Sequence, residues 1–428
     1  MGFSTQSPAS KIKNLIRLKI LHVIHSVDPK SGGPSHALYD LAKAQIQQGH
    51  EISIIATDRQ SGEQWNNPSD YQKTVHRAIP TGLKNLTLIP SYGRKSPWVR
   101  YGYSPECRTR IQELLGKNTL TSPSFDFVHV HGLFSQITQK ATDICKKLDI
   151  PYVVRPTGAL DELPMKKGAK HLKKIFLHCC LKKSLENAAF IHATSEKEAE
   201  SLTQLGLNVT IKLISLGVNF PNWDPEDYQK KFFNTFPILN DKPLVLCLSR
   251  IHPIKRLDLA ILAFAKLLEK IPNCQLIIAG NPTTHQQELQ QLIEDINLSD
   301  HIHFIGFLQG DLKEGALFSA NAFLQTSEHE NFGITVMEAL VHGLRVVCTK
   351  GVASGKYVES CEGGKITSDE PNAIAADLFN ILHNHALAVD LKLAEKVNKK
   401  YSWDSVATHL ESCYRSFLPK IPTNAENH

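Results

Sequence analysis

The sequence predicts an α/β protein made of two doubly wound units, each with its own parallel sheet. Short apolar runs alternate with stretches of helical spacing along most of the chain, which is the pattern of repeated βαβ units. A polar, proline-containing stretch at 219–242 interrupts this alternation once, and a second series then begins. The length of 428 residues also exceeds that of one typical domain.

The first series covers the N-terminal half. We expect a strand over 19–27, a glycine-containing turn, and a helix over 36–48 that stops at Gly49, since glycine commonly follows the last helical residue. Further strands are expected at 51–57, 126–131, 152–155, 190–194 and 211–215. These elements predict an N-terminal domain over residues 1–218.

The second series predicts a C-terminal domain over residues 219–401. Strands are expected at 243–249, 274–280, 301–307, 322–327 and 345–349, and helices at 258–270, 285–297, 311–320 and 333–343. We expect Asp258 to be the N-cap of its helix. A last helix over 402–418 would complete the N-terminal domain. Two such units would face a central cleft with the carboxyl ends of their strands, where open α/β sheets bind ligands.

Composition places the chain among ordinary globular proteins, with 42% apolar and 21% charged residues. The N-terminus lacks the features of a secretory signal, and no run approaches the roughly 18 apolar residues of a membrane-spanning helix. Nine cysteines lie mostly in apolar runs without zinc-ligand spacing, which predicts buried, reduced thiols. We therefore expect a cytoplasmic protein.

The positive charge is concentrated in one segment. Seven lysines and no acid lie between Leu163 and Leu185, and without them the net charge of +6 becomes −1. A nucleic-acid partner is therefore not expected. The lysine-rich segment 166–183 has two readings. It is either a solvated helix packed on the N-terminal domain, or a patch for anionic lipid, a lipid pyrophosphate or an acidic glycan at the inner face of the plasma membrane.

The densest chemistry lies between residues 326 and 338, where a strand ends and Gly333 opens a helix. Backbone N–H groups at a helix start, together with the positive end of its dipole, suit a phosphate. Glu330 should project over this helix start, and Glu338 should face the cleft from the helix flank. Each carboxylate can accept hydrogen bonds from two vicinal sugar hydroxyls. The alternative is a helix cap beside a solvated acid.

Two basic residues follow the first strand of the second series. Arg250 comes directly after that strand, and Lys255 lies five residues later in the loop before a helix. Two cations at this position can neutralise a diphosphate, since arginine offers a planar fork and lysine a point charge. The alternative is a pair of surface bases.

These parts together resemble glycosyltransferase family 4, whose members are retaining enzymes of the GT-B fold. The resemblance covers roughly 240–350 and comprises Arg250 and Lys255 after a strand, the turn AGNP, the GFL after HIHFI, and Glu330 and Glu338 around NFG. The N-terminal half is similar in a looser way, through the strand followed by GGP and the HVHG at 129–132. The final helix, with SWD, resembles the helix that crosses back onto the N-terminal domain in this fold.

The resemblance implies a role for each matching residue of the second half. Arg250 and Lys255 would bind the donor diphosphate, Glu330 the hydroxyls of the transferred sugar, and Glu338 the ribose. Backbone amides at the helix start would hold sugar and phosphate, namely those of Phe332, Gly333 and Ile334. The nucleotide base would meet a pocket made by Gly280, Phe307 and Leu308. One departure is Arg256, where many members have glycine after the lysine.

In the first half, Gly32 and Gly33 would face the donor, although plain turn chemistry also explains a glycine pair. A histidine at the place of His131 lies beside the donor sugar in the family, so His131 is the candidate for polarising or orienting groups at the reacting centre. A packed or surface histidine is the alternative. We expect His129 on the opposite face of the strand, packed in the interior.

The function expected from this resemblance is retaining transfer of a hexose from a nucleotide diphosphate sugar, of the UDP or GDP type, to a hydroxyl of a glycan or lipid-linked acceptor. No Asp-x-Asp motif occurs in the expected setting, so we expect neither metal nor cofactor. The alternatives on this fold are a sugar-nucleotide epimerase or phosphorylase and a non-catalytic sugar-nucleotide-binding protein. A nicotinamide-dependent dehydrogenase is disfavoured, because no Gly-x-Gly-x-x-Gly follows a strand.

Overall fold

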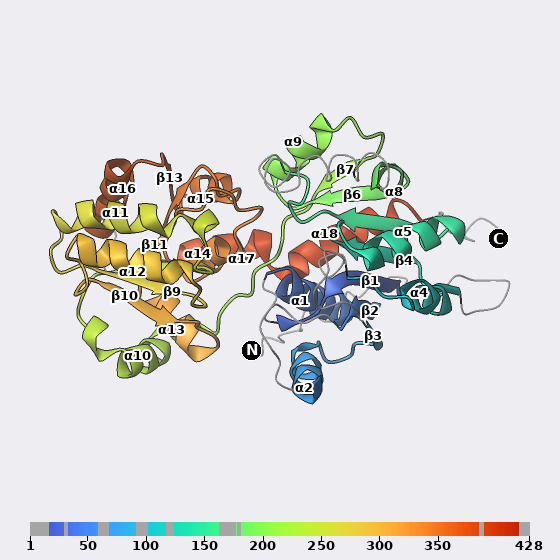
Figure 1. Cartoon of the computed structure of the whole chain (residues 1–428), viewed down its shortest axis with the longest axis horizontal. Helices are drawn as coiled ribbons and strands as arrows, with labels where there is room; N and C mark the ends of the chain where they lie inside the picture. Colours follow the sequence, from blue (N-terminus) through green and yellow to red (C-terminus); the bar gives the residue numbers. More distant parts are fainter. Residues whose placement is uncertain are drawn as a thin grey trace, which may run out of the picture. The chain divides into compact units, whose positions relative to one another are not determined.

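A computed structural model describes residues 17–29, 33–58, 68–90, 102–116, 124–161, 177, 181–384 and 389–418. The chain divides into two compact units (Figure 1). Unit 1 comprises Met1–Arg155, Cys179–Ile191 and Glu411–His428, and unit 2 comprises Pro156–His178 and His192–Leu410. The domain boundaries expected at 218 and 401 stay a prediction.

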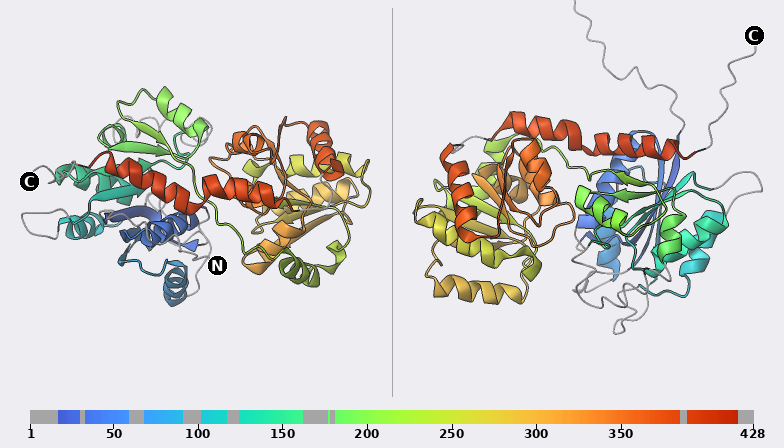
Figure 2. Two further views of the ribbon diagram at one scale, coloured as in Figure 1. Left: turned by 180° about the vertical axis from the view of Figure 1, so that it is seen from behind. Right: turned by 90° about the horizontal axis from the view of Figure 1, so that it is seen from above.

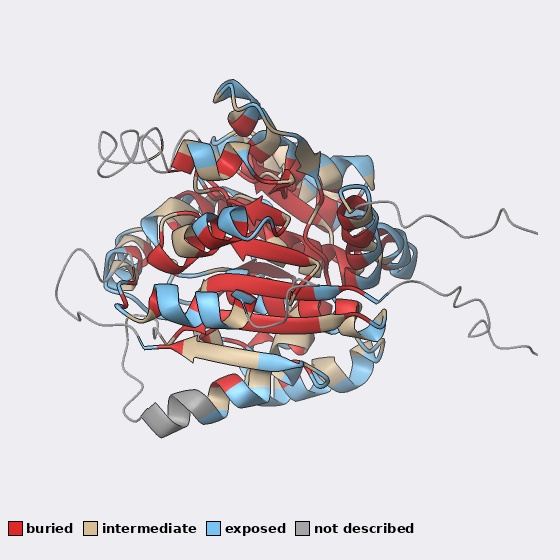
Figure 3. Ribbon diagram, turned by 90° about the vertical axis from the view of Figure 1, so that its right-hand side faces the viewer, coloured by how far each residue is buried: buried red, intermediate tan, exposed pale blue. Residues whose placement is uncertain are grey.

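The first sheet has seven strands in the described part of the chain, in the order β3-β2-β1-β4-β5-β6-β7. Their bounds are β1 Lys19–Ser26, β2 Glu51–Thr57, β3 Asn85–Ile89, β4 Phe127–His131, β5 Tyr152–Arg155, β6 Phe190–Ala193 and β7 Ile211–Leu213. Strand β1 pairs in parallel with both β2 and β4, so the strand order reverses beside it. Both β4 and β5 are fully buried, as expected of central strands covered on both faces. The strands in the middle of Figure 3 are accordingly red, the colour of buried residues.

Helices connect the strands of this sheet. They are α1 Gly33–Gln47, α2 Pro68–Ala78, α4 Cys107–Gly116, α5 Gln136–Lys147, α8 Lys182–Glu186 and α9 Glu196–Gln204. The expected C-terminal helix is present as α18 Trp403–Arg415, the last red helix in Figure 2. Its Tyr414 is fully buried, and the ring stacks on that of Phe127 with 4.9 Å between centroids. The end of the chain thereby contributes to the interior of unit 1.

The second sheet has six strands in the described residues, in the order β10-β9-β8-β11-β12-β13. Their bounds are β8 Leu244–Leu248, β9 Gln275–Ala279, β10 Ile302–Gly306, β11 Ala322–Gln325, β12 Val346–Thr349 and β13 Gly364–Thr367. In chain order this is the 3-2-1-4-5-6 arrangement of a Rossmann sheet, with its switch point between β8 and β11. Ligands bind such sheets at the carboxyl ends of those two strands.

Helices lie on both faces of the second sheet (Figure 2). They are α10 Pro225–Thr235, α11 Leu257–Leu268, α12 His285–Asp295, α13 Asp311–Ser319, α14 Ile334–Val341, α15 Gly355–Ser360, α16 Pro371–Asn384 and α17 Leu391–Tyr401, with 3-10 turns η4 Pro237–Leu239 and η5 Pro253–Lys255. The apolar face of α11 packs with strands and with α16 in one core that includes Phe264, Ile278 and Leu378. The α/β fold expected from the sequence is confirmed.

One helix lies where none was predicted, and one local expectation was wrong. The stretch 219–242 contains helix α10, which starts after an N-cap at Asp224. The N-cap of α11 is Arg256, and Asp258 lies inside the first turn, where its carboxylate accepts hydrogen bonds from the Arg256 side chain at 3.1 and 3.2 Å. An acid in the first turn stabilises the positive helix end without capping it.

Two general expectations can be compared with the described residues. Of the cysteines in this part of the chain, six are buried and Cys361 is partly buried, and none of them is joined in a disulfide. Burial raises the pKa of Cys247 to about 12. No helix among the described residues is both long and apolar enough to cross a membrane.

Candidate functional site

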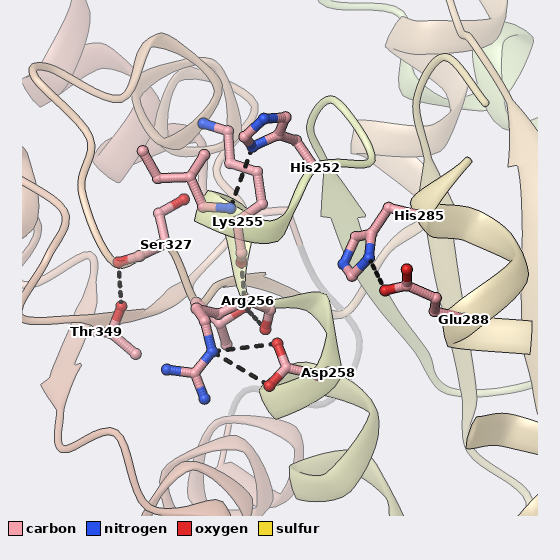
Figure 4. Close-up of polar contacts among 10 residues, drawn as sticks. His252, Lys255, Arg256, Asp258, His285, Glu288, Ser327 and Thr349 are labelled. Atoms are coloured by element: carbon pink, nitrogen blue, oxygen red, sulfur yellow. Dashed lines mark hydrogen bonds and ion pairs between the residues drawn. The ribbon is translucent and has the colours of Figure 1, made fainter. Parts of the chain in front are cut away.

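The loop after β8 is fastened to the loop after β11 by hydrogen bonds to backbone carbonyls. The Thr326 hydroxyl donates to the carbonyls of Lys255 and Arg256 at 2.9 and 2.8 Å. The Glu328 N–H donates to the Ile254 carbonyl at 2.9 Å. These bonds fix the short turn η5, whose last residue Lys255 is labelled in Figure 4, against the carboxyl end of β11. The basic loop is therefore held beside the acidic loop.

Lys255 and Glu330 form an ion pair within this frame. The lysine side chain is 11% exposed and the glutamate side chain 25% exposed, so water reaches the carboxylate more than the ammonium group. The backbone of Glu330 forms an isolated bridge with Val352, which fixes the loop before α14. Arg250 is exposed at the end of β8, and no salt bridge of the described residues involves it. An anion that binds beside these residues would find Lys255 already paired with Glu330 and the Arg250 side chain exposed to water.

Helix α14 starts in the way expected of an anion site. Gly333 is its N-cap with φ 83°, a left-handed conformation that glycine adopts without strain. A Cβ at this position would lie 2.7 Å from the Ser354 hydroxyl oxygen and 3.4 Å from Cγ of Glu330. No side chain caps the first turn, and that turn contains no acid. Backbone N–H groups without intrahelical partners thus lie beside Glu330.

Glu338 lies one turn further along α14 and has a basic partner that sequence reasoning missed. Lys313, on α13, donates to its carboxylate at 2.7 Å, and the two side chains are 26% and 21% exposed. The adjacent His342 bonds Glu314 through Nε2 at 2.7 Å. Because α13 is remote in sequence, no local pattern identifies Lys313 as the partner of Glu338. The second acid of the predicted site is therefore also held by a cation.

The residues expected at the base pocket have different environments. Phe307 is 58% exposed just after β10, whereas Leu308 is buried at 4%. A Cβ at Gly280 would lie 1.9 Å from the Ser249 carbonyl oxygen, so glycine is required there by the close packing of the loops after β8 and β9. Its expected part in a base pocket stays a prediction.

The backbone conformation at Arg256 bears on the one departure from the family pattern. Its φ of 49° lies in the left-handed region that glycine favours. A glycine at this position in other members is what this backbone conformation predicts. In this chain an arginine adopts this strained backbone conformation, and its guanidinium group forms an ion pair with the Asp258 carboxylate (Figure 4).

The residues expected in the first half are described within unit 1. Gly32 lies outside the described residues, and Gly33 is exposed as the first residue of α1. His131 ends β4 as expected but is only 2% exposed. The expectation that His129 faces the opposite side was wrong, since its ring stacks on that of His131 with 4.3 Å between centroids. Residues two apart on a strand share a face.

The structure thus brings part of the predicted site of the second half together at one place. Lys255, Glu330 and Gly333 are in direct contact or nearly so, and Phe332 is buried at 3% beside them. Glu338 lies along the same helix. Most of the lysine-rich segment, from 166 to 180, lies outside the described residues.

Two family models match the sequence in the same order as the two sheets. The model for glycosyl transferases group 1 matches residues 229–400, and the model for a glycosyl transferase 4-like domain matches residues 32–217. Together they cover well over half of the chain.

Individual relatives are distant. The phosphatidyl-myo-inositol mannosyltransferase of Mycolicibacterium smegmatis is 24% identical over 410 residues, which is 92% of both chains. An uncharacterized glycosyltransferase of Methanocaldococcus jannaschii is 25% identical over 211 residues, 48% of this chain and 54% of that protein. The chain thus matches about half the length of the latter relative. HepE of Anabaena, in complex with UDP and glucose, superposes with a TM-score of 0.72 at 17% identity, covering 94% of this chain and all of HepE.

The likeness to HepE supports the fold, and the family models carry the assignment. The chain belongs to the glycosyl transferases of group 1, it is a glycosyltransferase family 4-like protein, and it has the GT-B fold.

Proposed function

We propose that this protein is a retaining glycosyltransferase that moves a hexose from a nucleotide diphosphate sugar to a hydroxyl of a glycan or lipid-linked acceptor. One observation carries the proposal. The Lys255–Glu330 pair lies against the uncapped start of α14, at the switch point of the second sheet. This arrangement combines cations and backbone N–H groups for a diphosphate with a carboxylate for sugar hydroxyls.

Donor binding would change which groups the Lys255 and Glu330 side chains contact. Without donor, Lys255 and Glu330 neutralise each other. A diphosphate placed at the start of α14 would draw the Lys255 ammonium and the exposed Arg250 guanidinium to its oxygens. The Glu330 carboxylate would then accept hydrogen bonds from hydroxyls of the transferred sugar. Glu338, released from Lys313, would hold the ribose in the same manner.

Transfer would proceed by front-face attack. The acceptor hydroxyl oxygen forms a bond to the anomeric carbon on the side from which the diphosphate leaves, while the bond from that carbon to the phosphate oxygen breaks. The hydroxyl proton passes to the departing phosphate oxygen, so charge and atoms balance. Arg250, Lys255 and the α14 amides stabilise the negative charge that develops, and such preorganised charge is commonly the largest catalytic term. We propose that no metal or cofactor takes part. His131 would orient groups at the reacting centre.

The donor and acceptor classes are supported by the relatives. The mannosyltransferases of Mycobacterium tuberculosis among them are described as GDP-mannose-dependent, and HepE was crystallised with UDP and UDP-glucose. A donor of the UDP or GDP type is therefore proposed here. The relative from Mycolicibacterium smegmatis is a phosphatidyl-myo-inositol mannosyltransferase. This supports a lipid-linked acceptor, which the lysine-rich segment 166–183 would meet at an anionic membrane surface in the cytoplasm.

Product analysis tests the proposal. A panel of UDP and GDP sugars is ranked by the rise in melting temperature, and the best donor is incubated with glycan and lipid-linked acceptors. We expect free nucleoside diphosphate together with a lengthened acceptor, and a product linkage of the same anomeric configuration as the donor by NMR. An inverted linkage would contradict the retaining mechanism. Interconversion of the donor sugar would identify an epimerase.

Matched variants connect the activity to the site. Arg250→Ala and Lys255→Ala should abolish most turnover while leaving the far-ultraviolet spectrum intact. Lys266→Ala is the control, because this lysine is exposed on the same unit and its ion pair among the described residues is with Glu269, one turn away. Equal turnover in all three variants would show that the site lies elsewhere.

A further inference from the structure

Three histidine rings are gathered inside unit 1 at the switch point of its sheet. His22 lies on β1, and His129 and His131 lie on the neighbouring β4, with His22 directly opposite His129 in the parallel register. Their exposed fractions are 0%, 0% and 2%. The side chains of Gln45 on α1 and Tyr414 on α18 are hydrogen-bonded to these rings and are also buried. Buried polar groups of this kind are stable only when each is hydrogen-bonded.

The hydrogen bonds define a direction along the group. His22 Nε2 lies 2.8 Å from the Gln45 side-chain oxygen, and His22 Nδ1 lies 2.9 Å from His131 Nε2. An amide oxygen only accepts, so His22 carries its hydrogen on Nε2. Burial lowers the pKa of His22 to about 4, so the ring is neutral at physiological pH and its Nδ1 is an acceptor. His131 must therefore donate from Nε2.

Tyr414 fixes the other end of this chain of bonds. Its hydroxyl lies 2.7 Å from His129 Nδ1. Burial raises the pKa of the Tyr414 phenol, and a hydrogen bond from the Gln45 side chain acts in the opposite direction. The Gln45 NH₂ group is thus directed at the tyrosine, which leaves its oxygen for His22. This orientation of the Gln45 amide sets the direction of both bonds, and the reversed amide would reverse that direction.

We infer that Gln45 and Tyr414 are positioning residues which, through His22, hold His131 in the tautomer with hydrogen on Nε2 and a lone pair on Nδ1. This tautomer is the one in which His131 would act at the donor sugar, which is where the proposed function places it. Tyr414 of the C-terminal helix α18 thereby helps to determine which ring nitrogen of His131 carries hydrogen, although the two residues are far apart in the sequence.

A metal ion is the competing use of the same rings. The ligand nitrogens of His22, His129 and His131 lie within 4.8 Å of one another. The guanidinium of Arg155, opposite His131 on β5, is nevertheless buried at 1% and disfavours positive charge on His22. It would repel a bound cation in the same way. Both nitrogens of His22 also have hydrogen-bond partners already. These facts favour the hydrogen-bonded network.

The test is NMR on the full chain labelled with ¹⁵N-histidine, without donor, using long-range ¹H–¹⁵N correlations that distinguish protonated from unprotonated ring nitrogens. The His131 signals are assigned by their loss in His131→Gln. We expect protonated Nε2 and unprotonated Nδ1 in the wild type, and a mixture of both tautomers in Gln45→Met.

The control is Tyr152→Phe, which removes a different buried hydroxyl, one that donates to the Ser184 carbonyl at 2.7 Å. Tyr414→Phe should broaden or shift the His131 signals, and Tyr152→Phe should not. Hydrogen on Nδ1 in the wild type, or an unchanged tautomer in Gln45→Met, would overturn the inference. Stoichiometric binding of added Zn²⁺ with shifts of all three rings would replace it with a metal site. Because donor is absent, these readouts stand apart from any failure of the proposed activity.

Discussion

The replacement Lys255→Ala tests the ion pair at the start of α14. The wild-type ammonium group is 11% exposed and contacts a carboxylate on Glu330 that is 25% exposed. The replacement removes one of the two cations proposed to face the diphosphate and leaves one acid beside the helix start. It should therefore affect turnover and stability through separate physical causes.

The loss of turnover follows from the charge removed. Two unit charges 4 Å apart interact by about 4 kcal/mol at an effective dielectric constant of 20. Removal of a single group that stabilises developing negative charge commonly lowers kcat by about 10²–10³-fold. We expect Lys255→Ala to fall in this range.

The effect on stability should be small, because water can solvate the remaining Glu330 carboxylate. We expect the free energy of unfolding to fall by about 1 kcal/mol, as for exposed pairs, and not by the roughly 3–5 kcal/mol that follows the breaking of a fully buried pair. Adding Glu330→Gln removes the lone charge. The double variant should regain stability without regaining turnover.

The assay measures nucleoside diphosphate released at saturating donor, with Lys266→Ala as the control and urea unfolding for stability. A kcat of Lys255→Ala equal to that of the control, in a folded protein, would refute the proposed role of this cation. Recovery of turnover in the double variant would show that the Glu330 charge, and not the missing ammonium group, caused the defect.

Three further predictions concern backbone and buried groups. Gly333→Ala should cost about 1–2 kcal/mol, since φ is 83° and the new Cβ would lie 2.7 Å from the Ser354 hydroxyl, and an unchanged melting temperature would contradict this. Arg256→Gly should stabilise by about 1 kcal/mol or less by relieving the strain at φ 49°, whereas Arg256→Ala keeps the strain and loses the bond to Asp258, so a more stable alanine variant would be inconsistent. Because the pKa of His22 is about 4 in the folded protein and about 6.5 in the unfolded chain, only the unfolded chain binds a proton on this ring between pH 6.5 and 4. The free energy of unfolding of the wild type should therefore fall by about 3 kcal/mol over this range. Urea unfolding of His22→Gln should lack this contribution to the pH dependence.

Periodicity alone was sufficient to predict most strands, including the edge strands β7 and β10, but not the edge strands β3 and β13. The central strands are continuous apolar runs, such as β8 with all five residues buried. The edge strands β3 and β13 are only partly buried, so their polar residues interrupt the run that marks a strand. The apolar pattern did not reveal helix α10 for a similar reason, since Phe232 is its only buried residue.

The candidate site was predictable where it follows chain order. Gly333 and Glu330 belong to one short loop, so their proximity follows from local geometry. Lys313 and Glu338 come from two helices, and only the fold brings them together. The tautomer of His131 depends on Gln45, 86 positions away in sequence, and on Tyr414 near the chain end, and no local pattern contains that information.

The central claim is that a nucleotide diphosphate binds between the two basic residues and the start of α14. A crystal structure of the chain with the donor nucleotide chosen by thermal shift tests it most directly. We predict diphosphate oxygens at about 2.7–2.9 Å from the Arg250 and Lys255 side chains, with the α14 amides directed at the same group. A diphosphate bound elsewhere, with the Lys255–Glu330 pair intact, would contradict the account.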